Sequence, residues 1–201
     1  MKKINIYCAS KDVAQRKEVY SYIKENILKT YGSYPAPLDP DMLLIYAQIG
    51  GKVVGSIGVY LGGCSNELPY QKVIDNAKSE FSLLGRISDF AFVSRWTSTE
   101  GDIGMLLTYY AALYIERSGR SVALCFLKPR ILTYLNVLSN NSWSHVGEVA
   151  FDKKKIHKTD YNYFFTGQKP FFCKCEIPLF LNSISNRDRL QKLIKKVIIN
   201  F

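Results

Sequence analysis

The sequence predicts an α/β (or α+β) fold with three layers, in which helices flank a central mixed β-sheet. Three observations predict it. Segments with helical spacing alternate with β-rich runs along most of the 201 residues, which is typical of layered mixed folds. The pair Gly50-Gly51 joins two β-rich runs, a strong hairpin signal. Hydrophobic residues make up 47% of the chain and charged residues 22%, as in ordinary globular proteins.

The N-terminal third is expected to contain strands and one clear helix. Residues 1–8 are predicted to form a first strand. A helix is predicted over 12–29, because Asp12 and Gln15 have capping-box spacing and apolar residues recur every four positions after them. A proline-rich loop follows. The hairpin strands are expected at 43–49 and 52–61, and a short helix is expected within 67–79.

The rest of the chain alternates in the same way. A central strand is predicted over 85–95, followed by a polar loop and a helix over 104–118. A buried strand at 122–127 precedes a helix that Pro129 can open. Further elements are predicted as strands at 143–151, 160–165 and 171–177, and as a basic amphipathic helix at 186–200.

The sequence also predicts how the chain is organised and in which compartment it works. Residues 1–180 are expected to form one domain, with 181–201 as a C-terminal basic amphipathic helix packed on it or appended to it. No apolar stretch approaches the roughly 20 residues that cross a bilayer, and the first segment is too short for a signal peptide. We therefore expect a cytoplasmic protein.

The five cysteines support the same compartment. Their number is odd, their spacing is irregular and there is no C-x-x-C pair. Cys173 and Cys175 would point to one face of a strand, which is poor geometry for a mutual disulfide. Buried free thiols are expected, and no metal site.

The net charge of +10, from 27 Lys and Arg against 17 Asp and Glu, predicts an affinity for polyanions. Nucleic acid, anionic lipid, a phosphorylated cofactor and an acidic carrier protein all fit. The charge does not choose between them. The tryptophans form no recognisable RNA-binding signature, so nucleic acid is not expected.

A glycine-bearing loop at 97–103 leads into the helix predicted from 104. Unpaired backbone N–H groups and the helix dipole at such a junction suit a phosphate group. Taken alone, the pattern is more typical of a flexible turn.

The order of elements from the strand at 86–95 to the helix at 129–139 resembles the central half of a GNAT acyltransferase. In that family the loop and helix start hold the coenzyme A pyrophosphate, and the preceding strand contacts pantetheine. The resemblance therefore implies donor-binding roles for Phe92, Val93, Gly101, Asp102, Ile103 and Gly104. The loop departs from the family pattern, because Ser98 stands at the Arg/Gln position and Ile103 at the second glycine position.

Shorter pieces resemble two narrower groups with related folds, the thermostable haemolysin proteins and the acyl-homoserine-lactone (autoinducer) synthases. These pieces are Tyr31 with the proline-rich loop, Glu67-Leu68-Pro69, and the run 161–164 before Lys169-Pro170. The lactone synthases carry an acidic residue and then an arginine in the central strand. Here Arg86 precedes Asp89, so lactone chemistry does not carry over.

Acyl transfer to an amine needs a group that takes the ammonium proton and a proton source for the leaving thiolate. Asp89 is the candidate for the first role, and its alternative is an ion pair with Arg86 or Arg95. Both arginines are expected to bind substrate. Tyr134 is the candidate for the second role, and its alternative is core packing.

The leading hypothesis is an N-acyltransferase that moves an acyl group from an acyl-CoA or acyl-carrier-protein thioester to a small-molecule amine, such as an amino acid. The acyl carrier protein would then be a partner. One alternative is a GNAT-like module that binds acyl thioesters without catalysis. Another is a binder of nucleic acid or of a membrane surface through the C-terminal helix.

Overall fold

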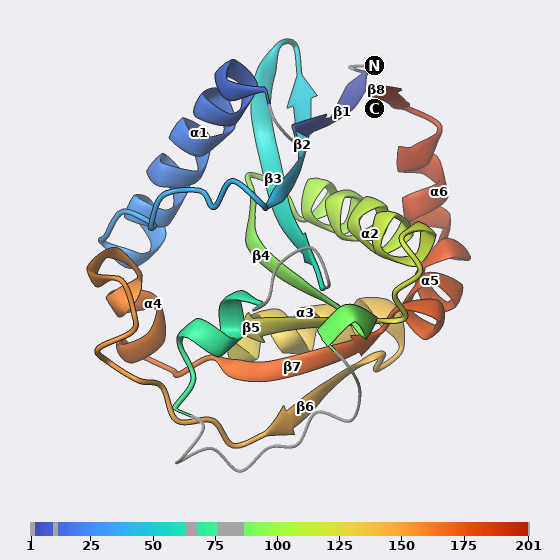
Figure 1. Cartoon of the computed structure of the whole chain (residues 1–201). Helices are drawn as coiled ribbons and strands as arrows, with labels where there is room; N and C mark the ends of the chain where they lie inside the picture. Colours follow the sequence, from blue (N-terminus) through green and yellow to red (C-terminus); the bar gives the residue numbers. More distant parts are fainter. Residues whose placement is uncertain (1–2, 10–11, 63–67, 76–86, 201) are drawn as a thin grey trace.

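The computed structural model describes residues 3–9, 12–62, 68–75 and 87–200. Its centre is an eight-stranded sheet with the order β6-β7-β5-β4-β3-β2-β1-β8 (Figure 1). Neighbouring strands are antiparallel except for β4–β5 and β1–β8, which are parallel. The strands are β1 Ile4–Ala9, β2 Leu43–Ile49, β3 Lys52–Leu61, β4 Phe90–Ser98, β5 Val122–Leu127, β6 Trp143–Gly147, β7 Phe171–Glu176 and β8 Val197–Asn200.

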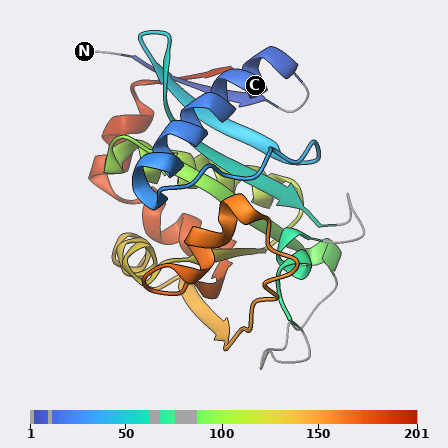
Figure 2. The same ribbon diagram turned by 90° about the vertical axis from the view of Figure 1, so that its left-hand side faces the viewer.

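Helices cover both faces of this sheet, so the predicted three-layer mixed fold is confirmed. Helix α1 (Val13–Tyr31) packs on β3 and β4 on one face, with the short α4 (Tyr161–Phe165) below it (Figure 2). Helix α2 (Gly101–Arg117) packs on β2, β3 and β4, and α5 (Ile177–Ser185) and α6 (Asp188–Ile194) pack on α2. Helix α3 (Pro129–Ser139) contacts α5.

Local signals place the first elements as the sequence predicts. The Asp12 carboxylate accepts a hydrogen bond from the Gln15 N–H at 2.9 Å and caps α1. Gly50 and Gly51 have φ of 60° and 77°, the left-handed values that a tight hairpin turn requires. The hairpin strands β2 and β3 have the predicted bounds, as does β5.

Side-chain alternation divides the core between the two faces. On β4 and β5, Ala91, Ala123 and Cys125 belong to the cluster under α2, whereas Phe92 and Phe126 belong to an aromatic cluster on the opposite face. Cys125, Cys173 and Cys175 are buried free thiols, as predicted, and Cys8 is a half-buried one. Cys64 lies outside the described residues.

Two predicted elements are wrong. Residues 160–165 are helical, because the aromatic run begins in a 3₁₀ turn, Lys158–Asp160, whose N-cap His157 accepts a hydrogen bond from the Thr159 N–H. The C-terminal helix stops at Ile194. Its last residues instead form β8, where β-branched side chains pair with β1.

The C-terminal segment is therefore part of the main sheet and its helical layer. Leu190 and Leu193 of α6 are buried in the cluster that includes α2. These two side chains of the predicted apolar stripe are covered by the protein's own core, whereas Ile198 on β8 is 40% exposed. Within the described residues, no helix is long and apolar enough to cross a membrane.

Other elements differ from prediction mainly in their bounds. Helix α2 begins three residues earlier than expected, β6 ends at Gly147, and β4 begins at Phe90 after a 3₁₀ turn at Ile87–Asp89. Of the helix expected within 67–79, the described part contains a 3₁₀ turn at Pro69–Lys72. Residues 67 and 76–79 and the start of the predicted central strand, 85–86, lie outside the described residues.

Candidate functional site

The two central parallel strands separate partway along their length. β4 and β5 pair at three positions, from Phe90↔Val122 to Phe92↔Leu124. Beyond Phe92, β4 continues to Ser98 beside β3, and β5 continues to Leu127 beside β7. A gap therefore opens in the middle of the sheet between β4 and β5. Each of these strands stays paired with its other neighbour, β4 with β3 and β5 with β7.

A β-bulge in β4 lies beside this gap. Between the pairs Ser56↔Thr97 and Gly58↔Ser94, β4 advances three residues while β3 advances two. The extra residue lies around Arg95, whose φ of 53° is in the left-handed region. The Ser56 hydroxyl donates to the Arg95 carbonyl at 3.2 Å and contacts the Thr97 hydroxyl at 3.0 Å. Bulges of this kind turn a strand and redirect its side chains.

A cavity of about 420 Å³ occupies the gap, within the range of about 300–1,000 Å³ that small-molecule sites usually have. Both faces of the sheet contribute to its wall. Phe92, Phe126 and Phe164 come from the aromatic cluster of the α4 face, whereas Ile131 and Leu135 come from α3 on the other face. The lining is mostly apolar and runs through the sheet.

The polar end of the cavity contains an ion pair. Nη1 of Arg95 lies 3.3 Å from Oδ1 of Asp160, and the two side chains are 18% and 24% exposed. Nη2 of Arg95 donates to the Ala36 carbonyl at 3.3 Å, and the Ala36 N–H donates to Oδ1 of Asp160 at 3.1 Å. The pair thus joins β4, the proline-rich loop and the turn before α4.

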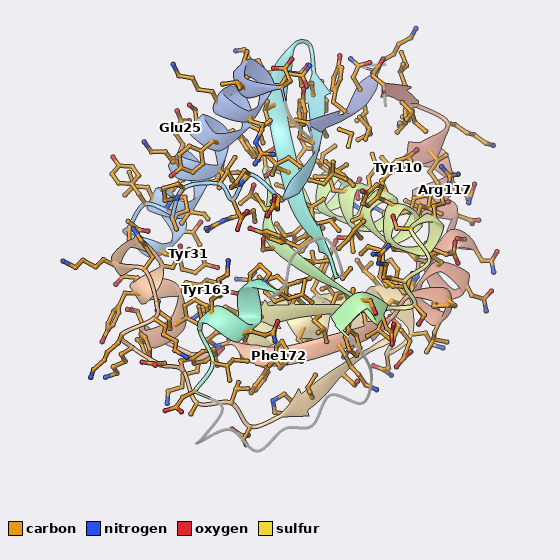
Figure 3. All side chains as sticks on the ribbon, in the orientation of Figure 1. Glu25, Tyr31, Tyr110, Arg117, Tyr163 and Phe172 are labelled. Atoms are coloured by element: carbon orange, nitrogen blue, oxygen red, sulfur yellow. The ribbon has the colours of Figure 1, made fainter. Side chains whose placement is uncertain are left out.

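Neighbouring contacts hold the same segments together. The Ser33 hydroxyl donates to the Thr159 carbonyl at 2.9 Å, and Nδ2 of Asn162 donates to the Tyr31 carbonyl at 3.0 Å. The rings of Tyr31 and Tyr163 meet edge to face with centroids 5.3 Å apart (Figure 3). These contacts make the end of α1 and the start of α4 one wall of the cavity.

Arg95, Phe92 and Val93, predicted as substrate or donor residues, all line the cavity. Sequence reasoning missed Asp160. Its segment was interpreted as a strand, and the polar turn Lys158-Thr159-Asp160 before the aromatic run is the signal that could have indicated a loop carboxylate.

The N-terminus of α2 offers fewer free amides than the sequence predicts. The N–H of Gly104 already donates to the Glu100 carbonyl at 3.1 Å, so within the helix only the N–H groups of Gly101, Asp102 and Ile103 lack an intrahelical acceptor. The Ile103 side chain is buried. An anion at this point would therefore meet three backbone donors.

Tyr134 lies beside these donors and is only half-buried. Its hydroxyl donates to the Gly101 carbonyl at 3.1 Å, and its ring stacks on Trp96 with centroids 6.3 Å apart. Burial raises the pKa of Tyr134, Asp102 raises it further, and Arg189 lowers it. The structure thus brings two predicted features, Tyr134 and the loop glycine, into contact.

Arg189 adds a positive charge that the loop itself lacks. Its Nε lies 2.6 Å from Oδ1 of Asp102, and it comes from α6, far along the chain. Arg189 therefore brings a cation to the start of α2, where it is paired with the carboxylate of Asp102.

The predicted position of Asp89 is wrong. It lies in the exposed 3₁₀ turn before β4, where its carboxylate accepts from the Ser88 hydroxyl at 3.1 Å, and it does not line the cavity. Arg86, its predicted neighbour, lies outside the described residues. No three His, Cys, Asp or Glu side chains of the described segments are grouped so that they could hold a metal ion.

No protein-family model matches the chain, and no curated protein matches it. Solved structures do match over nearly the whole length. TofI, in a ternary complex with an inhibitor and MTA, superposes with a TM-score of 0.67 at 11% identity, over 92% of this chain and 99% of that chain. FeeM, an N-acyl amino acid synthase from uncultured soil microbes, gives 0.60 at 11% identity, over 94% and 100%.

A further structure extends this likeness. BjaI, a CoA-dependent acyl-homoserine lactone synthase with SAM and isopentyl-CoA, gives a TM-score of 0.58 at 11% identity, over 100% of this chain and 94% of that chain. The chain has a GNAT-like fold. The cavity in the gap between β4 and β5 is lined by the bulge at Arg95 and extends to Thr97 and Ser98 at the end of β4, whereas residues 101–104 and Tyr134 do not line it.

Proposed function

We propose that the chain is an N-acyltransferase that moves an acyl group from an acyl-CoA or acyl-carrier-protein thioester to a small-molecule amine. The observation that carries the proposal is the cavity in the gap between β4 and β5. It is apolar through the sheet, polar near Arg95, and formed by strands that lead toward the start of α2. An acyl chain, an amine and a phosphate group need these three environments in this order.

The donor is proposed to lie along β4. Its acyl chain would run along Phe92 and Phe126 toward Ile131 and Leu135, where burial of apolar surface favours binding. Its phosphate groups would reach the amides of Gly101–Ile103 and the charge of Arg189. The isopentyl-CoA in the similarly folded BjaI supports this donor class.

Tyr134 is proposed to protonate the leaving thiolate. A phenol is protonated at neutral pH and can therefore act as a general acid, and burial raises the pKa of Tyr134 above its ordinary value. The hydroxyl donates to the Gly101 carbonyl in the free protein, so it would turn toward the sulfur once donor is bound. We also propose a cytoplasmic location, since the described cysteines are free thiols.

Native mass spectrometry with acyl-CoA donors of increasing chain length, and with acyl carrier protein, tests the proposal. Ile131→Trp places a ring in the cavity and is expected to weaken binding of long donors while short ones still bind. Leu132→Trp is the matched control, because Leu132 is also half-buried on α3 but does not line the cavity. Equal effects of the two variants on all donors would contradict the donor path.

A second candidate is a module that binds the thioester without turnover. It is favoured by the engaged Tyr134 hydroxyl and by the missing basic residue at position 98. Incubating the donor-loaded protein with a mixture of amines and amino acids separates the two candidates. N-acyl products indicate the enzyme, whereas bound donor with no product indicates the module.

A further inference from the structure

We propose that Asp160 binds the ammonium group of the acceptor and takes its proton, with Arg95 beside it as the positioning residue for the acceptor's negative group. This inference rests on the proposed N-acyltransfer. Among the described residues that line the cavity, Asp160 carries the one carboxylate. A cationic amine that enters an otherwise apolar cavity would therefore meet its counter-charge there.

The geometry leaves one side of this carboxylate available. Oδ1 accepts from Nη1 of Arg95 and from the Ala36 N–H. No described residue donates a hydrogen bond to Oδ2. With the Asp160 side chain 24% exposed, a substrate can reach Oδ2 while the surrounding wall shields the pair from bulk water.

Charge balance indicates what kind of amine fits. An ammonium group bound to Asp160 would compete with Arg95 for the carboxylate. The partly buried Arg95 guanidinium would then keep only a carbonyl oxygen as its partner. Uncompensated buried charges are unfavourable. An acceptor with its own carboxylate would pair with the unused donors of Arg95 and restore the balance, since guanidinium groups bind carboxylates well.

The proton balance of the reaction gives Asp160 its role. The ammonium nitrogen loses two protons as the C–N bond forms and the C–S bond breaks. The first moves to Asp160, whose carboxylate contacts the ammonium group in the proposed arrangement, and is later released to water. The second proton ends on the leaving thiol. Tyr134 donates its own proton to the sulfur and takes the second proton of the nitrogen in exchange.

Asp160→Asn tests this role and keeps the fold-stabilising contact. The amide oxygen can still accept from the Ala36 N–H, so the turn is expected to hold. Donor binding in native mass spectrometry should be unchanged. The rate of transfer at saturating acceptor should fall by about 10²–10⁴-fold, as for other general bases. Asp160→Glu, which keeps a carboxylate at this position, should restore part of the rate.

Asp152→Asn is the matched control, because Asp152 also accepts a backbone N–H in a turn, from Lys154 at 2.9 Å, but does not line the cavity. The inference is overturned if Asp160→Asn transfers at the control rate. It is also overturned if the rate falls only together with donor binding, or if Asp160→Glu restores none of the rate. A wild-type protein that transfers to no amine would instead reject the proposed function itself.

Discussion

Gly104 and Trp96 are packed so closely that a Cβ atom at position 104 would lie 2.9 Å from Cζ2 of the indole and 3.0 Å from the Ser98 hydroxyl oxygen. The indole N–H in turn donates to the Gly104 carbonyl at 3.2 Å. This contact presses the first turn of α2 onto the end of β4. It therefore sets the distance between the bulged strand and the amides proposed to bind phosphate.

Gly104→Ala is expected to destabilise the protein by about 1–3 kcal/mol, the usual effect of overpacking a filled site. Gly101→Ala is the matched control, since its Cβ would meet only the Tyr134 hydroxyl, at an ordinary 3.5 Å. Chemical denaturation of both variants checks the difference. Equal stabilities would mean that Trp96 moves aside freely.

Tyr134→Phe is expected to lower the rate of acyl transfer while donor binding survives. The phenol is the proposed acid, whereas the ring that stacks on Trp96 remains in the variant. Single-turnover kinetics with a bound donor measure the step. The rate of transfer should fall more for a donor with a poor thiol leaving group than for one with a good leaving group such as a thiophenol. Equal losses of rate for both donors would argue that the hydroxyl only supports Gly101.

Cys125 should report occupancy of the cavity. It lines the cavity, and burial raises its pKa well above the ordinary value, so its thiol stays protonated at neutral pH. Alkylation should be slow, should quicken as the pH rises, and should be blocked by a long-chain acyl-CoA. Peptide mass spectrometry reads the label. Cys8, half-buried on β1, should be labelled equally with and without donor.

Alkaline pH should unfold the protein in a defined window. Burial, as the largest cause, raises the pKa of Tyr22 and of Tyr46 to about 12. A tyrosine whose pKa is raised in the folded protein contributes stability. This contribution is complete below the pKa of the unfolded chain, near 10, and is lost as the pH rises toward 12. Denaturation at steps from pH 8 to 12, with absorbance at 295 nm, should show that the last of the fourteen tyrosines ionise together with unfolding. Complete tyrosine ionisation in a protein that is still folded would contradict this.

The sequence by itself determined the elements whose signals are local. The Asp12 cap, the Gly50-Gly51 turn and the apolar run at 122–127 each lie within a few residues, and each produced the predicted element. The resemblance of the elements from 86–95 to 129–139 to a GNAT acyltransferase predicted the neighbourhood of the candidate site.

The tertiary structure alone decided which residues meet. Periodicity shows which face of an element is buried but not what covers it, so residues 197–200 were interpreted as helix although β1 recruits them into the sheet. The ion pair between Arg95 and Asp160 joins positions 65 residues apart, and no local pattern encodes such a distance. Arg189 reaches Asp102 in the same way, because α6 packs on α2. The sequence predicted Asp89 as the carboxylate of the site, whereas the carboxylate that lines the cavity in the structure belongs to Asp160.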